Sequence, residues 1–322
     1  MIAFVFPGQG SQKVGMGQAL ASTFPECREV FAEADAALGE SLSHLCFAGP
    51  ESELQLTENT QPAILTASIA AFRLLERRGI RPSFVAGHSL GEYSANVAAG
   101  TFSFVDAVRI VRRRGRYMQE AVPVGAGAMA AVLGLDRAKV AQACEEAAQG
   151  DVVSPANLNA PGQVVIAGSS AAVARAGERA RALGAKRVVP LPVSAPFHCP
   201  LMKPAEERLA PELRALRVHA PSVPVVANVD AEPKTEAADA IEALVRQISS
   251  PVRWEDVVAR LASSGVRAYV EVGPGSVLSS LVRKIDREAR VANLESPADL
   301  EAVERLVSEV TAERPSDGFP DS

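Results

Sequence analysis

The pattern of apolar and polar positions predicts a chain in which short buried strands alternate with helices. One continuous apolar run, Ile2 to Phe6, is typical of a strand covered on both faces, and a mostly apolar run, Ala268 to Val272, predicts another strand. A third short run, Phe84 to Ala86, predicts another buried strand. Between these runs, apolar residues recur at helical spacing, as from Gln61 to Arg78 and from Val105 to Gln119. This alternation favours the α/β class.

The pattern changes between residues 125 and 194. There the predicted elements follow the order strand, helix, strand, strand, helix, strand, which is the ferredoxin-like order. We therefore expect a ferredoxin-like subdomain at 125–194, inserted into an α/β catalytic domain formed by 1–124 and 195–310. The final residues, 311–322, are polar with Pro and Gly and are predicted to be a disordered tail.

The stretch after the third apolar run contains candidate chemistry. The strand predicted at Phe84 leads into Gly87-His88-Ser89-Leu90-Gly91, and a segment of small apolar residues follows. A strand, a tight turn with G-x-S-x-G and a helix form the context of a nucleophile elbow. The turn would expose the Ser89 hydroxyl and direct the Leu90 N–H towards a developing oxyanion.

A serine hydroxyl needs a base that takes its proton. The chain has four histidines, at positions 44, 88, 198 and 219. His198 is the strongest candidate, because it lies in a proline-rich loop at the predicted domain junction, where clefts form. The other three histidines are more easily explained without a catalytic role. His88 is expected to be a packed turn residue, and His44 and His219 are expected to lie on the surface. No acidic residue is close to His198 in the sequence, so a Ser-His dyad is expected rather than a triad.

Composition and charge argue against some classes of binding partner. The chain has 322 residues, 48% of them hydrophobic, and a net charge of −5, which does not favour a polyanion as partner. The basic run from Arg109 to Arg116 is typical of a solvated helix face, and without interleaved aromatic residues it does not predict nucleic-acid binding. Arg112 and Arg116 share one face of this helix, whereas Arg114 points elsewhere and is the arginine that can face inward.

Further features favour a cytoplasmic protein without a metal or cofactor. The four cysteines are widely spaced and lack a C-x-x-C pair, which is typical of reduced thiols, and no metal-ligand spacing is present. No apolar run reaches the ~18 residues of a membrane span, and the N-terminus resembles a strand rather than a signal peptide. The loop Pro7 to Gln12 fits no nucleotide-binding fingerprint, but it can bring backbone N–H groups to a neighbouring active site.

Taken together, several motifs resemble those of the malonyl-CoA:acyl-carrier-protein transacylases of bacterial fatty-acid synthesis, which are related to polyketide acyltransferase domains. The similarity extends over about residues 1–290. Its motifs are Phe6-Pro7-Gly8-Gln9-Gly10-Ser11-Gln12, Gly87 to Ser94, Arg114-Gly115 with Met118-Gln119, Asn159 to Gln163, Phe197-His198 with Leu201-Met202, Asn228-Val229, Gln247, and Val272-Gly273-Pro274-Gly275.

The resemblance implies an α/β-hydrolase-like large domain with a ferredoxin-like insertion, and it implies roles for individual residues. Ser89 would accept the acyl group and His198 would be its base. The N–H groups of Leu90 and Gln9 would form the oxyanion hole. The remaining roles fall to Arg114, which would bind the malonyl carboxylate, and to Gln247, whose carbonyl would support His198.

The resemblance also implies substrates and partners. Malonyl-CoA and acyl carrier protein would be substrates of a monomeric enzyme, with no cofactor, nucleic acid or membrane involved. Lys186 and Arg187 match a basic pair that the family uses to dock the acidic carrier protein. Phe197 and Leu90 match the malonyl-selective type of the related polyketide enzymes. A polyketide acyltransferase acting in trans, a serine hydrolase of the same fold and a non-catalytic carrier-binding module are the alternative hypotheses.

Overall fold

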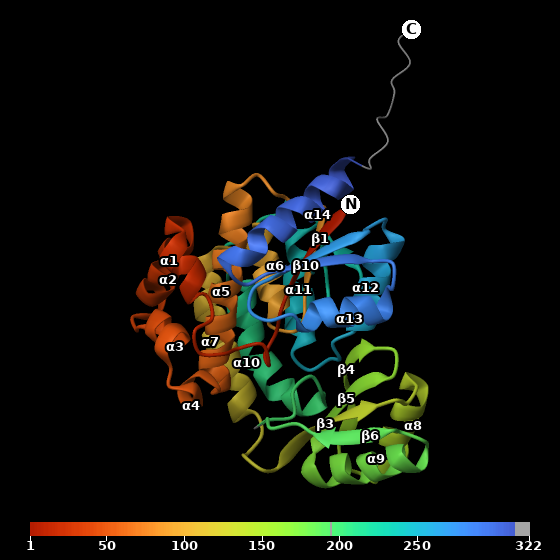
Figure 1. Ribbon diagram of the computed structural model, residues 1–322. Helices are drawn as coiled ribbons and strands as arrows, with labels where there is room; N and C mark the ends of the chain where they lie inside the picture. The colour runs from red at the N-terminus through yellow and green to blue at the C-terminus, as the bar shows by residue number, and fades with distance from the viewer. Residues whose placement is uncertain (194, 313–322) are drawn as a thin grey trace.

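The computed structural model describes residues 1–193 and 195–312, which form a large and a small lobe (Figure 1). The large lobe is built on a six-stranded sheet with the order β10-β9-β1-β2-β7-β8, parallel except for the last pair. Its strands are β1 (Ile2–Phe6), β2 (Phe84–Gly87), β7 (Val225–Val226), β8 (Pro233–Lys234), β9 (Ala268–Val272) and β10 (Arg290–Leu294). The predicted α/β class is confirmed.

The central strand β1 shows why this sheet is apolar throughout. All five of its residues are buried, and it pairs with β2 on one side and β9 on the other. Because side chains alternate along a strand, Phe4 and Phe6 enter the core on one face, whereas Ala3 and Val5 enter the core on the opposite face. The continuous apolar run therefore reflects helices packed on both faces of a parallel sheet.

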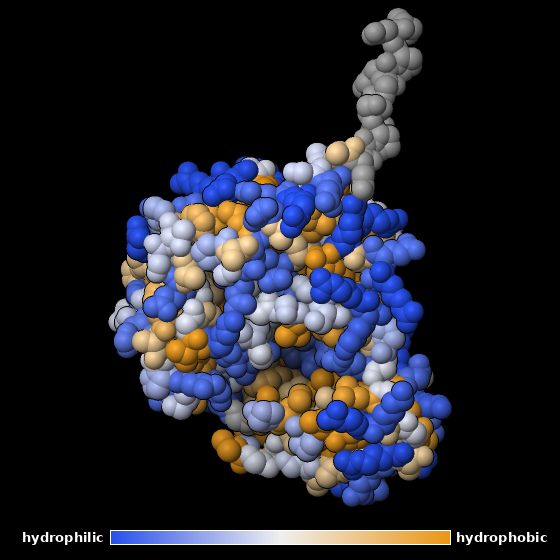
Figure 2. Space-filling view, in the orientation of Figure 1, coloured by the Kyte–Doolittle hydropathy of each residue, from blue (hydrophilic) through white to orange (hydrophobic). Residues whose placement is uncertain are grey.

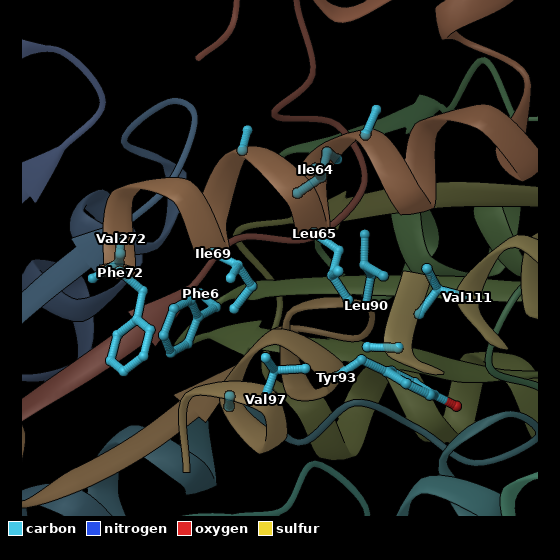
Figure 3. Close-up of a cluster of buried hydrophobic side chains, with 14 of the residues drawn as sticks. Phe6, Ile64, Leu65, Ile69, Phe72, Leu90, Tyr93, Val97, Val111 and Val272 are labelled. Carbon is cyan, nitrogen blue, oxygen red and sulfur yellow. The ribbon is translucent and has the colours of Figure 1, made fainter. Parts of the chain in front are cut away.

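Helices cover both faces of this sheet. The helices of the large lobe, some of them packed on other helices rather than on the sheet, are α1 (Gln18–Thr23), α2 (Pro25–Leu38), α3 (Leu42–Ala48), α4 (Glu51–Leu54), α5 (Thr57–Arg77), α6 (Gly91–Ala98), α7 (Phe104–Glu120), α10 (Lys203–Arg214), α11 (Ala237–Gln247), α12 (Trp254–Ser263), α13 (Val277–Ile285) and α14 (Leu300–Ala312). Figure 3 shows side chains of α5, Ile69 and Phe72 among them, filling the space beside α6 and β1. The Phe72 ring meets the Phe6 ring edge-on at 6.3 Å, a favoured aromatic geometry.

The small lobe has an antiparallel sheet with the order β4-β5-β3-β6. Its elements are β3 (Gly127–Leu133), α8 (Arg137–Ala148), β4 (Val153–Ala160), β5 (Gln163–Ser169), α9 (Ser170–Ala182) and β6 (Arg187–Pro190). This is the ferredoxin-like order that the sequence predicts. The composition of Asn159-Ala160-Pro161-Gly162 predicts a four-residue turn between β4 and β5. In the structure Asn159 and Ala160 belong to β4, so Pro161 and Gly162 alone form the turn.

Backbone hydrogen bonds join the two lobes. The Leu158 N–H donates to the Val252 carbonyl at 2.8 Å, and the Val252 N–H donates to the Ala156 carbonyl at 2.9 Å. Strand β4 of the small lobe is thus tied to the segment before α12 of the large lobe. Beside this junction, Figure 2 shows a hollow between the lobes.

The C-terminal part of the chain corrects one sequence prediction. The tail expected from residue 311 does not include Thr311 and Ala312, because α14 continues through both residues, with Val310 buried in its last turn. The rest of that predicted tail, residues 313–322, lies outside the described residues. Across 1–193 and 195–312, no helix has the length and apolar character needed to cross a membrane.

A buried carboxylate fixes helix α13 against the sheet. Glu271, the fourth residue of β9, is fully buried and accepts hydrogen bonds from the N–H groups of Leu278 at 3.0 Å and Ser279 at 2.7 Å. These donors belong to the first turn of α13, where backbone N–H groups have no partner within the helix.

Replacing this carboxylate should destabilise the protein. Glu271→Ala removes the acceptor for two buried N–H groups, so we expect the free energy of unfolding to fall by about 1–3 kcal/mol or more. Urea unfolding followed by circular dichroism measures the change. Glu33→Ala, on the exposed face of α2, is the control and should change stability by less than about 0.5 kcal/mol. Equal stability of the two variants would contradict this role of Glu271.

Candidate functional site

The turn around Ser89 has the backbone geometry of a nucleophile elbow. Ser89 lies in the left-handed region with φ 53°, an uncommon conformation for a non-glycine residue. A Cβ at Gly87 would lie 2.0 Å from the backbone of Gly91, and a Cβ at Gly91 would lie 2.0 Å from the Phe6 carbonyl oxygen. Only glycine fits at both positions, because α6 must start directly against strands β1 and β2.

Asn228 holds this turn in place. Its side-chain oxygen accepts from the Ser89 N–H at 2.7 Å, and its side-chain nitrogen donates to the Gly87 carbonyl at 2.7 Å. The sequence resemblance contained Asn228 without a role. Its position shortly after the short strand β7 gave no local signal that its amide would reach the elbow.

The structure brings His198 to Ser89, although 109 positions separate them. Ser89 Oγ lies 2.6 Å from His198 Nε2, and His198 Nδ1 lies 2.9 Å from the Gln247 carbonyl oxygen. Since a carbonyl only accepts, Nδ1 carries the proton and Nε2 is left as the acceptor for the Ser89 hydroxyl. Burial, followed by the positive charge of Arg114, lowers the pKa of His198 to about 3, so the imidazole is neutral at neutral pH.

The other three histidines lie apart from this dyad. His44 and His219 are exposed. His88 lies in the elbow, but its Nε2 is 2.8 Å from Asn159 Oδ1 in the small lobe, and its ring packs near Trp254. His88 therefore links the lobes beside the site.

Two backbone N–H groups are available near Ser89. Leu90 precedes α6, and the loop containing Gln9 packs on the elbow so closely that a Cβ at Gly8 would lie 2.4 Å from the His88 carbonyl oxygen. Within the described residues, neither the Leu90 nor the Gln9 N–H donates to a protein acceptor. Two such free donors near a nucleophile can stabilise an oxyanion.

Arg114 supplies a buried positive charge beside the nucleophile. It is 1% exposed, and it donates to Gln61 Oε1 at 2.8 Å, Gln247 Oε1 at 2.9 Å and Ser89 Oγ at 3.1 Å. Its guanidinium also lies 5.2 Å from the centre of the Tyr93 ring. Among the described residues, no carboxylate forms a salt bridge with Arg114, and its Nε has no hydrogen-bond partner.

Two residues of this site were missed by sequence reasoning. Gln61, on α5, accepts from Arg114, and Glu92, on α6, is 1% exposed and accepts from Gln247 Nε2 at 2.8 Å. Burial raises the pKa of Glu92 to about 7, against hydrogen bonds from Gln247 and Asn228 that lower it. Both lie in helices, where nothing in the local sequence distinguishes a buried polar side chain from an exposed one.

A cavity of about 120 Å³ gives access to these groups. Gln9, Ser89, Arg114, Phe197 and His198 line it, with an apolar wall of Met118, Met129, Leu191 and Val193. A second cavity of about 220 Å³ shares Gln9 and His88 with the first and continues between the lobes. Lys186 and Arg187 are exposed at the start of β6 and line neither cavity. The described residues contain no group of three or more acidic, cysteine or histidine side chains suited to a metal ion.

Comparison with known proteins agrees with this geometry. Residues 3–310 match the family model of the acyl transferase domain. The chain is 54% identical to malonyl CoA-acyl carrier protein transacylase of Salmonella typhimurium, over 93% of this chain and 97% of the relative. It is 49% identical to the protein of the same name from Bacillus subtilis, over 96% of this chain and 98% of the relative.

Solved structures give the same result. An acyl carrier protein S-malonyltransferase from Vibrio cholerae superposes with a TM-score of 0.92 at 48% identity, covering 94% of this chain and 99% of that one. A malonyl-transacylase solved in complex with its type II PKS acyl-carrier protein has a TM-score of 0.92 at 49% identity, with the same coverage. With these similarities along nearly its whole length, the chain belongs to the malonyl CoA-acyl carrier protein transacylase family of acyl transferase domains.

Proposed function

We propose that this protein transfers a malonyl group from malonyl-CoA to the phosphopantetheine thiol of acyl carrier protein through a malonyl-Ser89 intermediate. The observation that carries the proposal is the buried Arg114 beside the Ser89–His198 pair, with no carboxylate of the described residues in a salt bridge to it. An acyl group that brings its own carboxylate supplies the missing counter-charge. A serine hydrolase of simple esters would have no use for this arginine.

The chemistry follows from the hydrogen bonds. His198 Nε2 takes the Ser89 proton while Oγ attacks the thioester carbonyl. The resulting oxyanion is held by the N–H groups of Leu90 and Gln9. Collapse of this tetrahedral species breaks the C–S bond, and the departing CoA sulfur receives the proton from His198. The carrier-protein thiol then reverses these steps, which leaves Ser89 free and the malonyl group on the carrier protein.

The pathway and the setting of the enzyme are part of the proposal. We assign the enzyme to fatty-acid synthesis in the cytoplasm, as a monomer. The four cysteines are free and buried, as is usual in a reducing compartment. A polyketide role in trans is the second candidate, favoured by the similarity to the transacylase solved with a type II PKS carrier protein. We place the inserted subdomain at 125–194, a range that includes all four strands of the antiparallel sheet.

Mass spectrometry of the intact protein tests the central proposal. Wild-type protein mixed with malonyl-CoA should gain the mass of one malonyl group, and Ser89→Ala should gain none. His198→Ala should acylate about 10²–10⁴ times more slowly, the usual effect of losing a positioned base. If Ser89→Ala acquires the malonyl mass, Ser89 is not the acceptor.

Replacement of Arg114 tests the source of substrate selectivity. Arg114→Ala should lower kcat/KM for malonyl-CoA at least about 10-fold more than for acetyl-CoA, since a charged hydrogen bond of about 1.5–3 kcal/mol is lost with the first substrate alone. Arg113→Ala, its neighbour on α7 with a half-exposed side chain, is the control and should leave the ratio unchanged. Equal losses for both substrates would show that Arg114 does not bind the carboxylate.

Lys186 and Arg187 are proposed to dock the carrier protein. Both are exposed: Lys186 directly precedes β6, and Arg187 is its first residue. This edge strand leads from Arg187 to the cavity residue Leu191, four positions or about 13 Å further along the chain. Reversing both charges to Glu should raise the KM for carrier protein and flatten its salt dependence, while acylation by malonyl-CoA changes little. Reversal of Arg28 and Arg77, on α2 and α5, changes net charge equally and serves as control. An unchanged KM would place docking elsewhere.

Phe197 is proposed to exclude a branched acyl group. Its side chain lines the cavity with Ser89 and Arg114, and fitting one more methylene into a packed site costs about 1–3 kcal/mol. We expect kcat/KM to favour malonyl-CoA over methylmalonyl-CoA by about 10–200-fold. Phe197→Ser should reduce this ratio several-fold while malonyl transfer survives. An unchanged ratio, or parallel loss of both activities, would mean that Phe197 only packs against the core.

A further inference from the structure

We propose that Glu92 is a positioning residue for the carboxylate-binding arginine, acting through the side-chain amide of Gln247. The inference rests on the proposed malonyl transfer and adds a residue to which neither the sequence motifs nor the mechanism above gives a role. The observation that carries it is a hydrogen-bonded series of buried groups from Glu92 through Gln247 and Arg114 to Ser89 Oγ.

The charges on either side fix the orientation of the Gln247 amide. Its Nε2 donates to Glu92 Oε2 at 2.8 Å and to the Ser89 carbonyl at 2.9 Å, whereas its Oε1 accepts from Arg114 at 2.9 Å. The opposite orientation would set the amide oxygen against a carboxylate and a carbonyl, and the NH₂ group against a guanidinium. Glu92 therefore favours the orientation in which Gln247 offers an oxygen to Arg114.

The carboxylate of Glu92 is itself held firmly. It is 1% exposed, and Oε2 also accepts from the Asn228 N–H at 2.9 Å. Asn228 in turn binds the Ser89 N–H and the Gly87 carbonyl. The acceptor that orients Gln247 is thus fixed to the same backbone turn that carries the nucleophile, so Arg114 is oriented relative to Ser89.

The intervening amide has a physical advantage over direct contact. If Glu92 formed a salt bridge with Arg114, it would occupy the guanidinium and compete with the substrate carboxylate. With Gln247 between them, the negative charge lies close enough to stabilise the buried cation while the guanidinium remains available to an incoming anion.

This arrangement separates two effects of Gln247. Its backbone carbonyl holds His198 Nδ1, which serves the chemistry of every acyl group, whereas its side chain holds Arg114, which serves only acyl groups with a carboxylate. Glu92 contacts the side chain alone. Loss of the Glu92 charge should therefore affect malonyl transfer more than acetyl transfer.

The test compares Glu92→Gln with wild type at pH 8, above the pKa of about 7 of the Glu92 carboxyl, with malonyl-CoA and acetyl-CoA as acyl donors. Glutamine keeps the volume and an acceptor oxygen but not the charge. We expect the malonyl-to-acetyl ratio of kcat/KM to fall about 10-fold, on the order of one weakened charge-assisted hydrogen bond. In a Gln247→Met background, where the intervening amide is absent, Glu92→Gln should change the ratio less than about 2-fold.

Glu206→Gln is the matched control. Glu206 is also a buried carboxylate, and it bonds Ser249 in the segment after Gln247, but it does not contact the Gln247 side chain. Glu206→Gln should change kcat/KM for malonyl-CoA and for acetyl-CoA by the same factor, so the ratio of the two stays constant. If Glu92→Gln does not yield folded protein, Glu92→Asp tests the hydrogen bond rather than the charge, since aspartate keeps the charge but is one methylene shorter than the residue that accepts from Gln247 Nε2 at 2.8 Å; the malonyl-to-acetyl ratio should again fall.

Two results would overturn the inference. In the first, Glu92→Gln leaves kcat/KM for malonyl-CoA and acetyl-CoA unchanged or lowers both equally. In the second, Glu92→Gln lowers the malonyl-to-acetyl ratio as strongly in the Gln247→Met background as it does in wild type. Either can occur while wild-type protein still forms the malonyl-enzyme, so failure of this inference is distinguishable from failure of the proposed function.

Discussion

The site depends on close contact between the elbow backbone and the first strand of the sheet. At Gly91 the chain approaches the Phe6 carbonyl so closely that a single added carbon would overlap it, and Gly87 meets Gly91 at the same distance. This contact forces Ser89 into a left-handed conformation and aligns the start of α6 behind it. The strained conformation of Ser89 is maintained by the packed strands and helices around it; Figure 3 shows the side chains of Leu90 and Tyr93, shortly after Ser89, among the buried side chains of this core.

Most of the other polar side chains around this turn hold Ser89 and Arg114 in place and do not take part in the reaction themselves. Asn228, Gln247 and Gln61 are neutral amides, each placed where a charge or a strained backbone needs a partner of defined polarity. Amides suit this purpose because they donate on one side and accept on the other without adding charge to a cavity that contains Arg114. A buried cation surrounded by amides retains its attraction for an anion, whereas one paired to a carboxylate would lose it.

The sequence predicts the parts of this site that arise from local geometry. The elbow, the strands β1 and β9, and the helix α13 follow from short stretches whose apolar pattern or glycine spacing permits one structure. The choice of His198 among four histidines needed the domain junction and the family resemblance, because its contact with Ser89 spans 109 positions. Glu92 and Gln61 could not be assigned a role from pattern alone, since their function arises from side chains that meet across helices and strands. Strand β10 was not predicted because it is a half-buried edge strand with a mixed pattern. Helix α14 was also not predicted, although Leu300, Val303, Leu306 and Val310 are buried at helical spacing.

The electrostatics also explain why this site favours an acyl transfer over a hydrolysis. Ser89 Oγ lies within reach of both a neutral base and a cation, so a malonyl-serine would have its carboxylate fixed by Arg114 while its carbonyl faces the free N–H groups of Leu90 and Gln9. The cavities beside this ester lie between the lobes, and water can approach the ester through them. A substrate arm that fills them excludes water at the moment of attack. A thiol delivered by such an arm is therefore favoured over water by its position as much as by its nucleophilicity. The junction of the lobes matters because residues of both lobes line the cavities that would hold the arm.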